Sequence, residues 1–187
     1  EFRSVLFRSS TGSLSSVSLW VDYIYLDTDE RRRFAQVSHE YLIEQVQFTG
    51  DETVASGSNN IRLNFNHPVK ELVWVQYATG DTLALADVYQ GAGSTNMKLQ
   101  LNGHDRFAAR PALYFTHVQP FQHHTRIPAG NVFCYSFALK PEEHQPSGTC
   151  NFSRIDNATL TMSAAAIGVA KIFAVNYNVL RVMSGMG

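Results

Sequence analysis

The stretch Pro141-Glu-Glu-His-Gln-Pro-Ser-Gly-Thr-Cys-Asn-Phe-Ser-Arg-Ile-Asp156 decides how the fold is interpreted. Its Pro146-Ser-Gly148 segment is a turn signal, because proline fixes its own backbone angle and glycine adopts conformations that other residues avoid. The turn predicts a tight entry into a strand at Asn151, with Phe152 turned inward and Arg154 available for pairing. The stretch contains no catalytic combination of residues, so it indicates architecture rather than chemistry.

Apolar residues alternate with polar ones along much of the chain, as expected for strands with one buried face. Ile61, Leu63 and Phe65 alternate with polar residues, and residues 97–101 follow the same pattern. The segment 132–139 is apolar on both faces, which predicts a central strand between two packed layers. Further strands are expected at residues 41–48, 72–77, 151–155, 159–163 and 171–182.

Clusters of glycine, proline and asparagine separate these segments and predict turns. They occur at residues 50–51, 57–60, 80–81, 91–93, 128–130 and 146–148. Many short strands with regular turns are typical of a sandwich or barrel, so the expected class is all-β. Residues 105–127 lack strict alternation, and we interpret them as an excursion with one short helix near residues 107–114.

Length and charge limit the function classes. A chain of 187 residues can bury a core of its own within one large domain. Its formal net charge of -1 gives no bulk attraction to phosphate backbones, so no direct nucleic-acid partner is expected. The longest apolar run, residues 164–183, is interrupted by polar and charged residues such as Lys171 and Arg181. This composition favours a buried strand over a transmembrane segment.

Cysteine and histidine residues do not form a recognisable reactive site. Cys134 and Cys150 are too few for a disulfide scaffold and favour a reducing environment, while their pairing remains open. Cys134 lies among aromatic residues, so a buried inert thiol is favoured over a nucleophile. His117, His123 and His124 share one excursion, but adjacent histidines on a strand point to opposite faces, which disfavours a metal site. We therefore expect no catalytic residues, no cofactor, no metal and no enzymatic activity.

A charged segment, residues 27–33, lies at an expected surface turn or helix start. It lacks the spaced ligands and central glycine of an EF-hand calcium loop. Three arginines alone do not establish a phosphate site. Local charge pairing is therefore the favoured interpretation.

Three motifs carry a resemblance to a known family. They are Asp29-Glu-Arg-Arg-Arg-Phe-Ala-Gln36, Gln145-Pro-Ser-Gly-Thr-Cys-Asn-Phe-Ser-Arg-Ile155 and Val175-Asn-Tyr-Asn-Val-Leu-Arg181. With these motifs in order, residues 16–187 resemble the major capsid protein of large icosahedral nucleo-cytoplasmic DNA viruses, closest to the iridovirus type. The resemblance implies an eight-stranded antiparallel jelly-roll sandwich, the second half of a double jelly roll, with short helices in loops.

The resemblance also implies a division of the chain. Residues 16–36 are expected to be the last strand of the first jelly roll and a linker, and residues 37–187 the second jelly roll. The similarity of Val21-Asp22-Tyr23 to Val175-Asn176-Tyr177 suggests two equivalent closing strands. Residues 1–15 do not fit the resemblance, and we interpret them as a cloning or sequence-assembly scar.

The function implied by the resemblance is structural. The expected protein forms homotrimers with pseudo-hexagonal outlines, which assemble with neighbouring capsomers into an icosahedral shell. Minor capsid proteins are further candidate partners. The expected location is the capsid of the virion, assembled in the host cytoplasm. The alternative is a carbohydrate-binding β-sandwich module, and an enzyme of the cupin type is third.

Two sets of site residues follow from this interpretation. Arginine and carboxylate side chains at residues 29–33 are expected to clamp the two jelly rolls together by bidentate hydrogen bonds. Excursions at residues 79–96 and 105–127 are expected to supply an outward tower and subunit contacts, because aromatic side chains concentrate interface energy. The candidate clamp residues are Asp29, Glu30, Arg31, Arg32 and Arg33, and the candidate interface residues are Tyr114, Phe115 and Phe121.

Overall fold

The computed structural model describes residues 18–78, 96–128, 132–164 and 168–183. Backbone contacts divide the chain into two units. The larger unit is Glu40–Arg181, and the smaller combines Glu1–His39 with Val182–Gly187.

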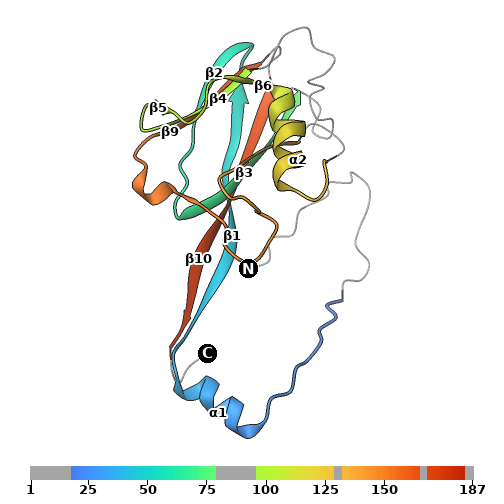
Figure 1. Ribbon diagram of the computed structural model, residues 1–187, viewed down its shortest axis with the longest axis vertical. Coiled ribbons are helices and arrows are strands. Elements are labelled where there is room, and N and C mark those ends of the chain that lie inside the picture. Colours follow the sequence, from blue (N-terminus) through green and yellow to red (C-terminus); the bar gives the residue numbers. More distant parts are fainter. Residues whose placement is uncertain (1–17, 79–95, 129–131, 165–167, 184–187) are drawn as a thin grey trace. The chain divides into compact units, whose positions relative to one another are not determined.

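One sheet of the larger unit, here called sheet A, has the strand order β1-β10-β3-β7 (Figure 1). Strand β3 also pairs with the short strand β8. The pairings of β3 with β10, β7 and β8 are all antiparallel. The strands are β1 (His39–Val54), β3 (Pro68–Ala78), β7 (Val132–Ser136), β8 (Cys150–Asn151) and β10 (Gly168–Val182).

The second sheet, sheet B, has the order β2-β9-β4-β5, and β4 also pairs with β6. Consecutive long strands alternate between the two sheets, and the pairings of β9 with β2 and β4 are antiparallel, as in a double-sheet jelly roll. This topology confirms the predicted all-β sandwich. The strands are β2 (Gly57–Arg62), β4 (Asn96–Leu101), β5 (His104–Asp105), β6 (Arg110–Pro111) and β9 (Ala158–Ala164).

The core lies between the inner faces of the two sheets. Every second side chain of a strand points into it, so the core residues alternate with outward-facing residues along each strand. In β3, Leu72 and Trp74 are each 1% exposed, and the Trp74 ring stacks on Phe133 with centroids 5.7 Å apart. In sheet B, Leu99 pairs with Leu160 across the ladder, and both are buried. The predicted alternation at residues 61–65 is also confirmed, because Ile61, Leu63 and Phe65 are all buried.

A two-residue turn, Asn102-Gly103, joins β4 to β5. Both residues have positive φ angles, 51° and 80°, as a type I′ hairpin turn requires. The Asn102 side chain accepts hydrogen bonds from the backbone N–H groups of Asp156 and Asn157, at 2.9 and 3.1 Å. The Asn-Gly pair is a strong hairpin signal in any sequence.

The helical segment of the 105–127 excursion begins later than predicted. A π-helical turn, η1 (Tyr114–Val118), continues into α2 (Gln119–His123). The expected helix near residues 107–114 is wrong, because residues before a proline avoid the helical region and Arg110 precedes Pro111. Those two residues instead form β6 against β4.

Two strand predictions need correction. Residues 151–155 contain a 3-10 helix, η2 (Phe152–Arg154), instead of a strand, because the Asn151 side chain accepts the Ser153 N–H and caps it. The segment around β7 is buried on both faces, with Phe133 0% and Cys134 5% exposed. Within the described residues, however, β7 ends the strand order of sheet A, so it is not central.

Some predicted turns also lie inside strands. Gly50 falls within β1, where its φ is 102°, and residues 57–60 belong to β2. The turn before β2 is closed by Asn59, whose side chain accepts the Ala55 N–H and donates to the Ala55 carbonyl, both at 2.8 Å. Predicted turns at residues 80–81 and 91–93 lie outside the described residues.

The smaller unit contains α1 (Thr28–Gln36). Asp27 caps its first turn by accepting the Glu30 N–H at 2.8 Å, and Asp29 pairs with Arg32 at 3.4 Å. The predicted helix start with local charge pairing is thus confirmed. Residues 18–27 carry no strand, and their large apolar side chains are exposed, with Trp20 and Tyr25 each at 91%.

Candidate functional site

Gln119 attaches the helical segment to the edge of sheet A. Its side chain is 3% exposed and bridges two elements. The Oε1 atom accepts the backbone N–H of Ser136 in β7 at 3.0 Å, and the Nε2 group donates to the Tyr114 hydroxyl at 2.9 Å. A buried amide with both groups paired fixes the segment firmly. This anchoring role was missed in the sequence, where one glutamine carries no distinguishing pattern.

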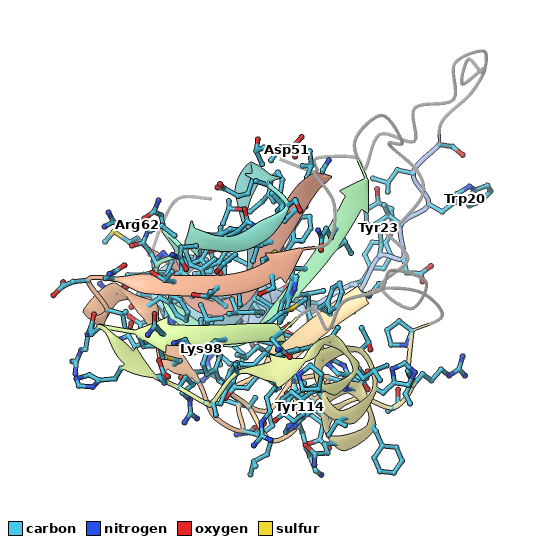
Figure 2. The ribbon with its side chains drawn as sticks, turned by 90° about the horizontal axis from the view of Figure 1, so that it is seen from above. Trp20, Tyr23, Asp51, Arg62, Lys98 and Tyr114 are labelled. Atoms are coloured by element: carbon cyan, nitrogen blue, oxygen red, sulfur yellow. The ribbon has the colours of Figure 1, made fainter. Side chains whose placement is uncertain are left out.

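The three candidate interface aromatics differ in exposure. Phe115 is 0% exposed and packs on Trp74 with centroids 5.3 Å apart, so its ring belongs to the core and has no surface to offer another subunit. Tyr114 is half-buried in the helical segment, with the Arg110 guanidinium 5.6 Å from its ring centroid (Figure 2). Phe121 is 77% exposed. Of the three candidate interface residues, only Phe121 and the exposed part of Tyr114 are accessible to another subunit.

Residues 137–149 form a loop that is closed by its own hydrogen bonds. The Ser147 hydroxyl accepts the Lys140 N–H at 2.9 Å and donates to the Lys140 carbonyl at 3.2 Å. The Ser136 hydroxyl donates to the Ala138 carbonyl at 2.7 Å. Gly148 has a φ of 139°, and a Cβ atom there would lie 3.1 Å from the Phe137 carbonyl oxygen. The loop thus has a defined shape at its surface, where Leu139 is 73% exposed.

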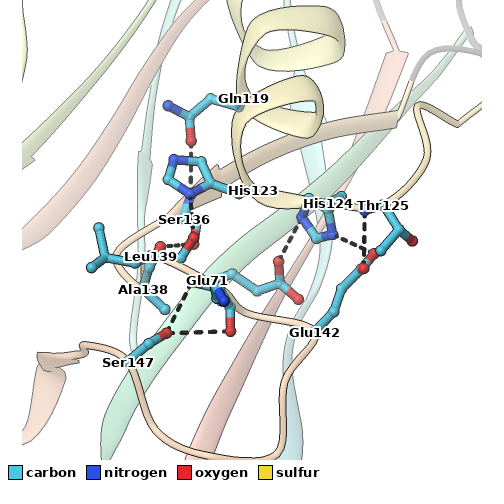
Figure 3. A network of polar contacts seen from close by, with 11 residues as sticks. Glu71, Gln119, His123, His124, Thr125, Ser136, Ala138, Leu139, Glu142 and Ser147 are labelled. Carbon is cyan, nitrogen blue, oxygen red and sulfur yellow. Dashed lines mark hydrogen bonds and ion pairs between the residues drawn. The ribbon is translucent and has the colours of Figure 1, made fainter.

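Two adjacent histidines connect this loop to α2 (Figure 3). His123 Nδ1 lies 3.0 Å from the Leu139 carbonyl oxygen. His124 lies between two carboxylates, with Nδ1 3.1 Å from Glu142 Oε1 and Nε2 3.1 Å from Glu71 Oε2. The second carboxylate oxygen of Glu142 accepts the Thr125 N–H at 3.0 Å. The two histidines therefore contact different partners, and both side chains take part in polar contacts.

The electrostatics of this cluster favour a charged imidazole. A hydrogen bond with the Cys134 side chain and the contact with the Glu71 carboxylate raise the pKa of His124 to about 10, although partial burial opposes the shift. Hydrogen bonds from Thr125 lower the pKa of Glu142 below its ordinary value. Two adjacent charged residues, Lys70 and Glu71, stand in a largely apolar strand, which indicates buried charge but does not identify the partner of Glu71.

The predicted turn and strand-entry residues lie around η2. Phe152 is buried and packs edge-on against Phe65 and Phe137, at centroid distances of 6.0 and 5.9 Å. Pro146 and Arg154 are exposed. The Phe152 N–H donates to the His67 carbonyl at 3.1 Å, which joins this turn to the start of β3. Phe152 therefore supports the sandwich directly.

The candidate clamp residues all lie in α1 of the smaller unit and are exposed. Apart from the Asp29–Arg32 pair, the structure does not assign them a role. They remain predictions.

The cysteines are both free and cannot pair with each other in this register. Cys134 lies opposite Val73 and Cys150 opposite Val69 on the same strand, β3. At 3.3 Å per residue these positions are about 13 Å apart, beyond the reach of a disulfide. Among the described residues, no group of three His, Cys, Asp or Glu side chains could hold a metal ion. No helix in the described ranges is long and apolar enough to cross a membrane.

Comparisons with known proteins agree with this architecture. Residues 30–187 match the family described as large eukaryotic DNA virus major capsid protein. The major capsid protein of Pyramimonas orientalis virus is 58% identical, over 96% of this chain and 50% of that protein. The major capsid protein of Tipula iridescent virus is 25% identical, over 95% of this chain and 47% of that protein. This chain spans about half the length of these curated relatives.

A solved structure also has a similar fold. A chain from a quasi-atomic model of the PBCV-1 virus capsid aligns with a TM-score of 0.73 and 41% sequence identity, covering 88% of this chain and 54% of that chain. The predicted jelly roll is thereby confirmed. The names of the relatives describe a structural role in the capsid. The chain belongs to the family of large eukaryotic DNA virus major capsid proteins.

Proposed function

We propose that the chain is part of a major capsid protein that forms homotrimers with pseudo-hexagonal outlines and assembles into an icosahedral shell in the virion. The observation that carries the proposal is the 41% identity and shared fold with a chain of the PBCV-1 virus capsid. A jelly roll suits this role, because two packed sheets form a stiff wall while the loops are free to make contacts.

Electron microscopy of the complete gene product tests this function. We expect particles of trimer size, or ordered arrays of them, at micromolar concentration. Size-exclusion chromatography with light scattering supplies an independent mass. A product that stays monomeric over a range of pH, salt and concentration contradicts the proposal.

We propose further that residues 37–187 form the second of two jelly rolls and that residues 16–36 contain the last strand of the first jelly roll and a linker. The exposed apolar side chains at residues 19–21 and 23–25 support this, because a contiguous apolar surface of this kind is normally covered by a partner. In this arrangement the α1 charges at residues 29–33 clamp the two domains. Reversing Arg31 and Arg33 to Glu should make the linker more sensitive to limited proteolysis in the complete gene product.

We propose Phe121 as an aromatic anchor of the contact between subunits. Its ring is largely exposed on a helix that is itself fixed to β7 by Gln119, so little ordering is needed on binding. Phe121→Ala should weaken trimers by at least about tenfold in dissociation constant, within the usual range for an aromatic anchor.

The conservative variant Phe121→Leu is the matched control, since it keeps apolar bulk at the same place. We expect it to retain most of the trimer population, as measured by mass photometry during dilution. Equal trimer stability in Phe121→Ala and the parent protein removes Phe121 from the interface.

A further inference from the structure

Three segments that are distant in sequence meet at His124. Glu71 comes from β3, His124 follows the last residue of α2, and Glu142 comes from the 137–149 loop (Figure 3). The Glu71 and His124 side chains are only 12% and 17% exposed, so the contact is largely removed from water. Alternation of apolar residues in the sandwich does not require a charged group at this place.

The positions of the ring nitrogens determine the charge of the imidazole. A neutral imidazole has one N–H group and one lone pair, whereas the charged form donates from both nitrogens. Here each nitrogen lies 3.1 Å from a carboxylate oxygen. A neutral ring would direct its lone pair at one of the carboxylates, which is repulsive. The imidazolium is attracted to both carboxylates: Nδ1 hydrogen-bonds Glu142, whereas the contact of Nε2 with Glu71 is an ion pair without hydrogen-bond geometry.

We propose that His124 is a charged clamp that holds the 137–149 loop against the end of α2, and that the clamp opens when the imidazolium is lost by substitution or at alkaline pH. Glu142 is held at two points, because its second oxygen accepts the Thr125 N–H. The His123 contact with the Leu139 carbonyl oxygen is a second connection between the same two segments. Phe121 and Leu139, both largely exposed, are thereby carried on one ordered surface.

The charged groups around the ring set the pH range of the clamp. They are Glu71 from β3, Cys134 from β7 and Glu142 from the loop. Because the pKa of His124 is raised in the folded protein, its stabilising effect is complete below about 6.5 and is lost as the pH rises through about 10. Because the pKa of Glu142 is lowered, its effect is present above its ordinary value and is lost in acid. The clamp is therefore closed across the neutral range.

An NMR titration of the His124 ring in the intact chain tests the charge directly. We expect the His124 Cε1–H signal to show no inflection between pH 5 and about 8, a range that includes the ordinary histidine pKa near 6.5. An inflection of His124 near that ordinary value overturns the proposal. This readout needs no variant, so it holds even if a substitution prevents folding.

Hydrogen exchange tests the mechanical part of the proposal. In His124→Gln we expect the Thr125 amide and the amides of the non-proline residues in 139–147 to exchange about tenfold faster at neutral pH, with the amides of β9 unchanged. His144→Gln, in the same loop, is the matched control and should leave the rates unaltered. Unchanged protection in His124→Gln contradicts the clamp.

The Cys134 side chain also faces the His124 ring, so its contribution must be separated. In Cys134→Ser we expect the loop still to lose protection as the pH rises, but at a lower pH than in the parent protein, because the Cys134 contact contributes to the raised pKa of His124. If this variant abolishes the alkaline opening, the thiol and not the imidazolium controls the loop, and the proposal is wrong. All three readouts are intramolecular, so they are independent of whether the chain assembles into capsomers.

Discussion

The sandwich interior and the helix-and-loop surface are stabilised in different ways. Between the sheets, buried side chains such as Trp74, Leu99 and Leu160 recur at every second position, and each contact is non-directional. At the surface formed by α2 and residues 137–149, single polar groups such as Gln119 and His124 each join particular partners. A repeated pattern is visible in a sequence, whereas a contact made once between distant segments is not.

The difference has an energetic consequence. Removing a core side chain weakens packing that many residues share, so the whole unit loses stability. Removing one polar contact at the surface frees a local segment and leaves the sandwich folded. Substitutions in the two regions should therefore differ both in the size of the stability change and in how far it spreads.

The largest expected effect comes from Trp74→Ala. The indole stacks on Phe133 and packs on Phe115, and its side chain is nearly inaccessible to solvent. We expect the free energy of unfolding to fall by about 3–5 kcal/mol, measured by urea denaturation. The transition should remain single, with hydrogen exchange accelerated in both sheets.

Trp20→Ala is the matched control, because this indole is 91% exposed in the smaller unit. It should change the free energy of unfolding by less than about 0.5 kcal/mol. A Trp74→Ala protein as stable as the Trp20→Ala protein would mean that the core does not lie between the sheets as described.

A smaller effect is expected in the loop for Gly148→Ala. The φ of 139° is strained for any residue with a Cβ atom, and that atom would lie 3.1 Å from the Phe137 carbonyl oxygen. We expect a loss of about 1–3 kcal/mol, confined to the loop in hydrogen exchange.

Gly57→Ala separates the two causes. Gly57 also has a positive φ, 102°, but no atom lies within 4 Å of its added Cβ. The Gly57 variant should therefore lose less stability than the Gly148 variant in the same urea experiment. An equal loss of unfolding free energy in the two variants would show that backbone strain is the only cause, and that the loop moves to accommodate the new Cβ atom near Phe137.

The sandwich could be predicted from the sequence because alternation acts locally. Ile61, Leu63 and Phe65 are buried as their spacing indicates, although the strand itself ends at Arg62. The position of β7 could not be predicted in this way. Its two apolar faces suggested a central strand, but η1 and α2 lie at this edge, with Gln119 bonded to Ser136. A strand has two apolar faces in its sequence whether a helix or a second sheet covers its outer face, so the sequence does not distinguish the two cases.

The candidate interface was predictable only in part. Aromatic content identified the excursion, but the π-helical turn at residues 114–118 changes which positions face the core. As a result Phe115 is buried and Phe121 is exposed. The ion pair of His124 with Glu71 was beyond prediction, because it depends on the register between β3 and the end of α2.

The smallest expected effect, and the sharpest check on the surface, is Phe121→Ser. Serine and phenylalanine have similar helix propensities, so the substitution tests the ring and not the backbone of α2. With 77% of Phe121 exposed, the free energy of unfolding should change by less than about 0.5 kcal/mol in urea denaturation. A loss above about 1 kcal/mol would mean that the ring packs within its own subunit, and Phe121 would then belong with the interior residues. If Phe121→Ser leaves the free energy of unfolding unchanged but weakens the trimers, the Phe121 ring contributes to contacts between copies of the chain and not to the fold of one copy.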